Sequence, residues 1–393
     1  HSATTTTIDP VKIAANDTTN TLYVPQSPKY HLHKLNPFYS AAYCYAGDIS
    51  VQQTMYRPAY YFGLGKSIAY QSALSAANDP VWSNGGKTVT ITMKSWSWTN
   101  ANTKTYTSNG DGTVTMGTDN FSSVASTARD VLFWLNMDKA MENGQFYQKD
   151  KARKTVNGAY AACGFVPGLG LPDQVASVSA PNGLAGQSVQ ITFNDVENQS
   201  WMLSNELSQI QPMPPAWDSP AIVAAVKDSS QWKVPYTGTA TSCAGEAFAS
   251  VTTSGNDLCS YVYSYLRSLP LTDSLWHWSN GPYRIYDVGY SAGSPDGNQT
   301  IVANTHYSGP VSAKAVKRVV WLPEADTASE IAQLQSGTLT SGYVTPDLVT
   351  ASPGVGAAGS NLDSTIDSKY KTVGSTSWGV GYWQLNFGTD YST

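Results

Sequence analysis

Residues 83–99, SNGGKTVTITMKSWSWT, and residues 126–142, STARDVLFWLNMDKAME, decide the fold of this chain because they carry two different periodicities. The first begins with a Gly-Gly turn and then alternates apolar residues with threonines, which predicts a half-buried strand at the edge of an antiparallel hairpin. In the second, apolar residues recur at helical spacing, and Thr127 and Asp130 are spaced as a helix cap. The sequence therefore predicts a strand and, after an interruption, a capped helix.

Residues 100–124 separate this strand from this helix and are rich in Asn, Thr, Gly and Ser. Two short runs of β-prone residues flank the sequence Asn-Gly-Asp-Gly at residues 109–112, which is a strong turn signal. We therefore expect a surface hairpin or a loop insertion here.

The length of 393 residues is too great for a single core and indicates two or three domains. Charged residues make up 13% of the chain, about half the share of about 25% that is usual for soluble domains. Ser, Thr, Asn, Gly and aromatic residues are plentiful, which is typical of secreted proteins. The net charge of −5 and the lack of a Lys/Arg cluster argue against nucleic-acid binding. No run of 18 apolar residues is present, so we expect no segment that spans a bilayer.

Four cysteines allow three pairings. Cys243 and Cys259 flank a small polar loop, so we expect them to form a disulfide, and Cys44 would then pair with Cys163. The alternative is four buried free thiols in a cytosolic protein. The secreted type of composition favours the disulfides.

The order of motifs along the chain resembles a known family. The strand NGGKTVTITMKSWSW and the apolar helix after it, then NGPYRIYDVGY at residues 280–290 and QTIVANTHYSGP at residues 299–310, are similar to the family 5 solute-binding proteins of ABC importers, the peptide and nickel-binding group. Asn36-Pro37-Phe38 also resembles the family's pattern after its first strand. The resemblance extends from residue 21 to residue 393 and implies an N-terminal portion that lacks most of a third domain.

This resemblance implies an α+β (mixed α/β) fold that is periplasmic-binding-protein-like and bilobal, with an extra inserted domain. The implied division is a disordered tether (1–20), a discontinuous large lobe (21–63 and 198–385), an inserted small domain (64–197) and the start of a missing third domain (386–393). Within the large lobe, we expect residues 218–256 to be polar and irregular.

The resemblance also implies which residues contact a ligand, because it places certain segments along the cleft of the family. Tyrosine and tryptophan suit cleft walls, since they offer a flat apolar face and a polar group, although most of the aromatic residues are expected in the core. Asn205 and Glu206 are further candidates, while Glu206 could equally cap or pair within its own helix. The candidates in cleft-lining segments are Tyr39, Tyr43 and Tyr45; Tyr343, Val344 and Thr345; and Trp378 and Tyr382.

The function implied by the resemblance is extracellular capture of an oligopeptide and its delivery to the membrane subunits of an ABC permease. The protein would be a monomer, lipid-anchored on the outer face of the cytoplasmic membrane or periplasmic. An oligosaccharide is the alternative ligand, and a nickel complex is disfavoured because only His31 and His33 lie close together in the sequence. We expect no cofactor, no metal site and no enzymatic activity, since the G-x-S-x-G and H-E-x-x-H motifs are missing. A secreted hydrolase and a noncatalytic adhesion or scaffold protein are the alternatives from other classes.

Overall fold

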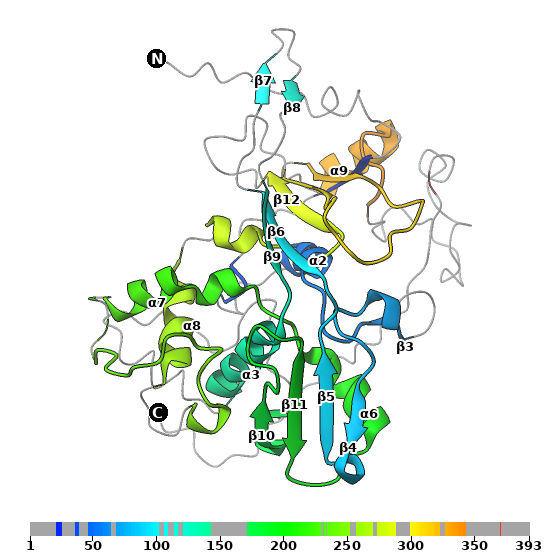
Figure 1. Ribbon diagram of the computed structural model, residues 1–393. Helices are drawn as coiled ribbons and strands as arrows, with labels where there is room; N and C mark the ends of the chain where they lie inside the picture. The colour runs from blue at the N-terminus through cyan, green and yellow to red at the C-terminus, as the bar shows by residue number, and fades with distance from the viewer. Residues whose placement is uncertain are drawn as a thin grey trace, which may run out of the picture.

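The computed structural model describes residues 21–25, 36–38, 46–63, 68–101, 106–108, 114–116, 121–142, 171–228, 230, 232, 234–251, 257–269, 273–287, 299–322, 327–342 and 370. These residues form a mixed arrangement of helices and strands with two four-stranded sheets (Figure 1). The predicted mixed α/β class is therefore confirmed. Among these residues, no helix is both long enough and apolar enough to cross a bilayer.

The first sheet has the strand order β10-β11-β5-β4 and is antiparallel throughout. Val89 and Ile91 on β5 are fully buried, whereas Thr90 and Thr92 are half-buried, so the predicted alternation is confirmed. The prediction that this strand lies at an edge is wrong, because β5 pairs with β4 on one side and with β11 on the other. The strands are β4 (Val81–Ser83), β5 (Thr88–Thr92), β10 (Val175–Ser179) and β11 (Ser188–Phe193).

Helix α3 (Ala128–Glu142) is the predicted capped helix, and it packs against β11 and α8 (Leu258–Ser268) (Figure 1). The backbone N–H of Thr127 donates to Oδ2 of Asp130 at 3.3 Å, which satisfies one of the free donors at the helix start. Trp98 donates its indole N–H to the same carboxylate oxygen at 2.9 Å. The two parts of the stretch that decides the fold are therefore joined by one buried hydrogen-bonded group.

The second sheet has the order β1-β14-β13-β12, and its first and last members along the chain lie side by side. Thr21 pairs with Arg318 and Val24 with Trp321, in parallel orientation, while the other pairs are antiparallel. The chain therefore leaves this sheet after its first strand, builds the other sheet and then returns. The strands are β1 (Thr21–Val24), β12 (Tyr283–Asp287), β13 (Gln299–Ala303) and β14 (Arg318–Trp321).

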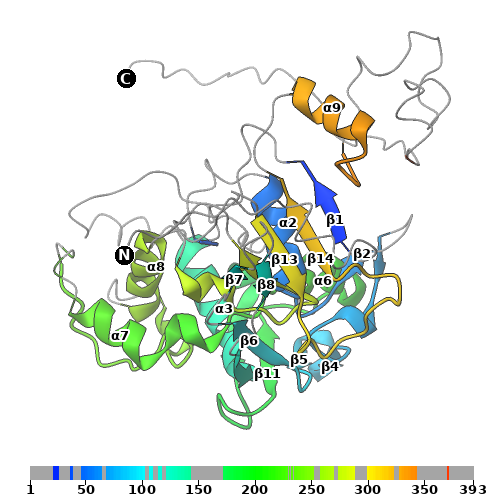
Figure 2. The ribbon, with the colours of Figure 1, turned by 90° about the horizontal axis from the view of Figure 1, so that it is seen from above.

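Helices lie on both faces of the second sheet. Successive side chains of a strand point to opposite faces, and Val319 joins the main core with Met55 of α2 (Ala46–Met55), while Val320 joins a separate cluster with Leu334 of α9 (Thr327–Ser336). Figure 2 shows α9 next to β1, whose Tyr23 belongs to the same separate cluster. Helix α2 ends at Met55, three residues before Pro58, and α9 follows β14.

The described residues between the first strand motif and α3 form antiparallel strand pairs, in agreement with the hairpin that was one of the two predictions. β6 (Ser97–Ala101) pairs with β9 (Phe121–Ala125), and β7 (Tyr106–Ser108) pairs with β8 (Val114–Met116). The turn signal at residues 109–112 lies outside the described residues. The remaining elements are β2 (Phe62–Gly63), β3 (Ala69–Tyr70), α5 (Leu171–Gln174), α6 (Gln199–Asn205), α7 (Pro220–Lys227) and 3₁₀ turns at Ser72–Leu74, Asn84–Gly86, Leu207–Gln209, Pro215–Asp218, Phe248–Ser250 and Ser274–His277.

Helix α7 corrects the expectation that residues 218–256 are irregular throughout. The Ser219 hydroxyl accepts the N–H of Ile222 at 3.3 Å, and Pro220 occupies the first helical turn, where its missing N–H costs nothing. The helix is two turns long and buries Ile222, Val223 and Val226. Its apolar run is short and lies between polar stretches, so the composition of the whole segment did not indicate a helix.

The Asn36-Pro37-Phe38 motif lies in the core. Phe38 is fully buried and makes edge contacts with Trp217, Tyr263 and Trp276 at ring distances of 5.4, 5.8 and 6.1 Å. The Asn36 amide donates to the carbonyl of Leu266, at 2.9 Å, near the end of α8. These three residues therefore anchor the chain after β1 by packing.

Candidate functional site

Two of the ten predicted ligand contacts, Asn205 and Glu206, are among the described residues. The other eight (Tyr39, Tyr43, Tyr45, Tyr343, Val344, Thr345, Trp378 and Tyr382) lie outside them, as do Cys44 and Cys163. The positions of the predicted aromatic contacts relative to one another therefore stay a prediction.

Asn205 and Glu206 lie at the end of α6, and each has a different environment. The Asn205 amide donates to the carbonyl of Trp201 at 3.0 Å and to the Ser204 hydroxyl at 2.8 Å, so it is engaged within its own helix. Glu206 is fully buried, and neither of its carboxylate oxygens has a hydrogen-bond partner. Burial raises the pKa of Glu206 to about 7; the side chain of Gln174 opposes this rise and the charge of Glu197 adds to it.

We expect the Glu206→Gln substitution to change stability in a pH-dependent way. The pKa of Glu206 is higher in the folded protein than its ordinary 4.5, so the native carboxyl is favourable at low pH and this advantage is lost as the pH rises through about 7. The variant should be more stable than the native protein by up to roughly 3 kcal/mol at pH 8 and by much less at pH 4.5. Urea unfolding at the two pH values measures the difference, with the exposed Asp195→Asn as control for a lost charge. An equal effect at both pH values would contradict the buried, unpartnered carboxylate.

The motifs that carry the family resemblance meet at one place between the two sheets, which we call the motif junction. It consists of the end of α2 and the residues after it (54–57), the start of β6 (96–100), the segment 279–283 and the turn 304–307. Thr99 and Ser279 exchange two backbone hydrogen bonds of 2.8 Å. The N–H of Asn280 donates to the carbonyl of Met55 at 3.0 Å, and the N–H of Arg57 donates to Oδ1 of Asn280 at 2.7 Å.

Asn304, the first residue of the Asn-x-x-Tyr-x-Gly turn, links three parts of the motif junction. Its amide donates to the carbonyl of Gly281 at 3.0 Å, and its own N–H donates to the carbonyl of Pro282 at 2.8 Å. Its Oδ1 accepts the Thr99 hydroxyl and the N–H of His306, both at 3.1 Å. A buried amide with donor and acceptor both satisfied fixes the geometry of the backbone segments that it joins.

Two glycines of these motifs allow close approach. A Cβ on Gly281 would overlap the backbone oxygen of Thr54 and lie 2.9 Å from the carbonyl carbon of Met55. A Cβ on Gly309 would overlap the hydroxyl of Tyr307, whose side chain extends over it. The Gly-Pro-Tyr motif is therefore needed for backbone contact with α2, and the glycine of the turn makes room for the tyrosine.

Aromatic rings and cations gather beside the motif junction. Trp96 and Tyr307 meet edge to face at 5.4 Å, and the Lys94 ammonium lies 5.4 Å from the Trp96 ring centre. The Arg57 guanidinium lies 4.9 Å from the centre of the Tyr61 ring. A second set stands on β12 and β9: Arg284 lies 4.9 Å from the centre of the Phe121 ring, and that ring is 4.5 Å from the ring of His306. Cations over aromatic faces are attracted by the ring quadrupole, which holds both partners in place.

These groups are suited to binding a polar ligand. Tyr61, Arg57 and Tyr307 are half-buried and offer hydroxyl and guanidinium donors next to flat apolar faces. Within the described ranges, no group of three or more His, Cys, Asp or Glu is placed to hold a metal ion. Trp96 and Tyr307 belong to the motifs that carry the family resemblance, but the sequence alone did not identify them as site residues. The signal that could have identified the site is the cluster of arginine and tyrosine in the sequence YRPAYY at residues 56–61.

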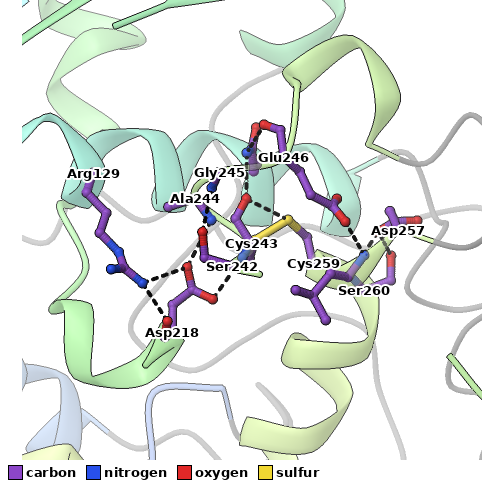
Figure 3. The surroundings of a disulfide bond; sticks show 12 residues. Arg129, Asp218, Ser242, Cys243, Ala244, Gly245, Glu246, Asp257, Cys259 and Ser260 are labelled. Atoms are coloured by element: carbon purple, nitrogen blue, oxygen red, sulfur yellow. Dashed lines mark hydrogen bonds and ion pairs between the residues drawn. A yellow bond between two sulfur atoms is a disulfide. The ribbon is translucent and has the colours of Figure 1, made fainter. Parts of the chain in front are cut away.

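The predicted disulfide between Cys243 and Cys259 is confirmed. It lies beside the fully buried Asp218, whose two carboxylate oxygens accept the N–H groups of Cys243 and Ala244 at 2.8 and 2.9 Å (Figure 3). Arg129 of α3 lies 3.5 Å from the same carboxylate and donates to the Asp218 carbonyl at 2.5 Å. Burial raises the pKa of Asp218, while these hydrogen bonds and the Arg129 charge act in the opposite direction.

The loop that precedes Cys259 is also held on α3. The Asn136 amide donates to the carbonyls of Cys243 and Glu246 at 2.9 and 3.0 Å, and Lys139 donates to the carbonyl of Phe248 at 2.6 Å. Disulfide, buried carboxylate and helix therefore fix one loop from three sides.

The other carboxylates near the disulfide also serve the backbone. Asp257 caps α8 by accepting the N–H of Ser260 at 2.9 Å, and Glu246 accepts the N–H of Leu258 at 2.5 Å (Figure 3). Burial raises the pKa of Glu246 to about 7. These contacts give the three acidic residues a structural role in the loop.

No protein-family model matches the chain, and no curated protein matches it. Solved structures do. One is DppA, an ABC transporter-associated periplasmic binding protein from Helicobacter pylori in complex with the peptide STSA (13% identity, TM-score 0.48, covering 85% of this chain and 49% of that chain). Another is HbpA2 from Haemophilus parasuis (16% identity, TM-score 0.45, covering 83% of this chain and 48% of that chain). A third is NikZ from Campylobacter jejuni in complex with Ni(L-His) (14% identity, TM-score 0.43, covering 84% of this chain and 44% of that chain).

The chain thus spans about half the length of these solved structures. They include binding proteins of the group that the sequence motifs resemble. At these identities and TM-scores, the similarity says nothing about the ligand of this chain.

Proposed function

We propose that this chain belongs to an extracytoplasmic solute-binding component of an ABC importer, which captures a ligand between lobes and delivers it to the permease. The observation that carries this proposal is the path of the chain. β1 pairs in parallel with β14 in one sheet, and the sequence between them builds a second sheet before it returns. The family motifs then meet where the two parts join, through Thr99, Ser279 and Asn304.

This path supports the proposed domain division. Residues 21–63 and 198–385 would form a discontinuous large lobe that contains the sheet of β1, β12, β13 and β14. Residues 64–197 would form the inserted small domain that contains the sheet of β4, β5, β10 and β11. The contact between Thr99 and Ser279 would then join the small domain to the large lobe.

An extracytoplasmic location is supported by the disulfide, because disulfides persist in oxidising compartments and are rare in the cytosol. A tether at residues 1–20 and a lipid anchor on the outer face of the membrane remain part of the proposal, as does a periplasmic location. The protein would act as a monomer with no cofactor.

We propose an oligopeptide as the ligand, held in an extended form by backbone hydrogen bonds with roomy pockets for its side chains. The predicted contacts are the eight residues outside the described part, with Asn205 and Glu206 at the end of α6. An oligosaccharide is the second candidate, since tyrosine and tryptophan faces also suit sugar rings. The twelve tryptophans and 24 tyrosines of the chain support both.

A thermal-unfolding panel on the protein in the form in which it occurs in its host separates these ligands. The panel contains tri- to pentapeptides, cello- and malto-oligosaccharides and nickel–histidine, each at increasing concentration. A ligand that binds only the native state stabilises it by about 2.7 kcal/mol at one hundred times its Kd. We expect a saturable rise with peptides; a rise with sugars alone would replace the peptide by an oligosaccharide.

The same panel tests the hydrolase and scaffold alternatives. Mass analysis of the incubated ligands should show them intact. Cleaved peptides or glycans would contradict the binding-protein proposal in favour of a hydrolase. No stabilisation by any of these ligands, with the ligands intact, would contradict it in favour of an adhesion or scaffold role.

A further inference from the structure

Arg57 stands out among the cations near the motif junction because its backbone is fixed on both sides. Its N–H donates to Oδ1 of Asn280 at 2.7 Å, and Pro58 follows it. The next N–H, that of Ala59, donates to the carbonyl of Ile210 at 2.8 Å. A long side chain that starts from a fixed backbone loses less conformational entropy when it binds a ligand.

The guanidinium of Arg57 has no acidic partner among the residues described. It is half-buried, it lies 4.9 Å from the Tyr61 ring centre, and its Nε is buried without a hydrogen-bond partner. Burial raises the pKa of the Tyr307 hydroxyl, and both the charge of Arg57 and a hydrogen-bonding contact from the Arg57 side chain oppose this rise. That hydroxyl is buried and has no hydrogen-bond partner of regular geometry.

Two other cations among the described residues are compensated. Arg129 is paired with the buried carboxylate of Asp218. Lys94 donates to the carbonyl of Ser72 at 2.6 Å and is attracted by the charge of Asp79. A partly desolvated charge without a counter-ion costs free energy, which a bound anion would relieve.

We propose that Arg57, Tyr61 and Tyr307 form a binding site for a carboxylate group. The planar fork of an arginine matches the two oxygens of a carboxylate, and the phenol groups of Tyr61 and Tyr307 would supply further O–H donors. Trp96, which packs edge to face on Tyr307, offers an apolar wall for the carbon attached to the carboxylate. A single guanidinium matches the single charge of a carboxylate better than the double charge of a phosphate.

This carboxylate could come from a free organic acid or from the C-terminus of a peptide. The site does not depend on the proposed transport function, because its residues, and the lack of an acidic partner for Arg57 within the described ranges, are features of this chain itself. The two sources share the same chemistry and are separated by the choice of probe.

The test follows the side-chain Nε–H resonance of Arg57 by NMR in the whole protein, assigned by its loss in Arg57→Lys. The probes are acetate, tri-alanine and tri-alanine amide, each titrated against chloride at equal ionic strength. We expect acetate to shift the resonance saturably and chloride not to. Tri-alanine should bind at this resonance only if peptides are a source, and its amide should then bind at least tenfold more weakly.

Variants show which groups hold the carboxylate. In the Arg57 variants, which lack the Nε–H resonance, acetate binding is followed at the indole N–H resonance of Trp96. Arg57→Gln should weaken acetate binding by about thirtyfold, and Tyr61→Phe or Tyr307→Phe by about tenfold each, as expected for hydrogen bonds to a charged group. Arg57→Lys keeps the positive charge but loses the planar fork, so its affinity for acetate should lie between those of the native protein and of Arg57→Gln. Lys314→Gln, which removes an exposed positive charge, should change nothing. Circular dichroism melting of each variant confirms that it is folded.

A shift of the Arg57 resonance that acetate and chloride cause equally would overturn the proposal, as would unchanged acetate binding in Arg57→Gln. If peptides bind the protein with the same affinity in the Arg57→Gln variant and as amides, the peptide C-terminus is refuted as the source of the carboxylate while the transport function stands. If acetate binds at Arg57 and no peptide binds anywhere, the site stands and the transport function loses its peptide ligand.

Discussion

The Gly281→Ala substitution is expected to destabilise the protein by about 3 kcal/mol or more, since it overpacks a fully formed contact between backbones. The new Cβ would overlap the Thr54 carbonyl oxygen and approach the Met55 carbonyl carbon to 2.9 Å. Backbone atoms at the end of α2 cannot move aside as a flexible side chain can. Guanidinium unfolding followed by circular dichroism measures the loss.

Gly183→Ala is the matched control for this substitution. Gly183 has a φ of +78°, and a Cβ there would meet no heavy atom within 4 Å, so only the backbone conformation is strained. We expect a loss of about 1 kcal/mol for this variant. Equal losses for Gly281→Ala and Gly183→Ala would contradict the close contact at the motif junction.

The double substitution Cys243→Ala/Cys259→Ala is expected to cost about 3 kcal/mol of stability. The two cysteines are separated by 16 positions in the sequence, and closing a loop of about 15 residues restricts the unfolded chain by roughly this amount. Denaturant unfolding of the variant, of the native protein and of the native protein after reduction measures the effect. Reduction would also open the predicted Cys44–Cys163 bond, so the reduced protein should lose at least as much stability as the variant.

Asp218→Asn tests whether the disulfide or the buried carboxylate holds the loop. One oxygen of the carboxylate would be replaced by an amide that cannot accept, so either Cys243 or Ala244 would lose its acceptor and Arg129 would lose its counter-charge. We expect a loss of about 2 kcal/mol or more. A double cysteine variant that loses less than about 1 kcal/mol, beside an Asp218→Asn variant that loses far more, would contradict the disulfide as a main constraint.

Local periodicity predicted the elements whose neighbours are close in sequence or whose faces are clearly divided. β5 alternates because one face lies on the core, and α3 begins directly after Thr127 because Asp130 is at the right spacing to accept the Thr127 N–H. The hairpin of β10 and β11 and the helix α8 follow from the same kinds of pattern. These features depend on a few consecutive residues, so the sequence alone contains them.

Partners from distant parts of the chain could not be read from periodicity. β5 alternates in the same way at an edge and in the interior, and only the arrival of β11 decides between them. Helix α7 was missed because its short apolar run, capped by Ser219, stands among polar residues.

The candidate site was harder still to predict, because its residues come from distant parts of the sequence. The contact of Arg57 with Asn280 joins residues that are 223 positions apart, and the ring contact of Trp96 with Tyr307 also joins separate segments. The family resemblance gives the order of the motifs along the chain. Their contacts at Asn304 depend on how the chain returns to the sheet of β1 after it has built the other sheet. That Arg57 lacks an acidic partner in the part of the chain that the structure describes can be seen only in the folded protein.

Native mass spectrometry of the protein purified from its host, before and after addition of a peptide mixture, tests the central claim most directly. A solute-binding protein should carry adducts that disappear when it is denatured, with mass differences that match amino-acid residues. Adducts spaced by sugar units would keep the binding role and change the ligand. A protein that binds neither peptide nor sugar, and whose native and denatured masses agree throughout, would contradict the account.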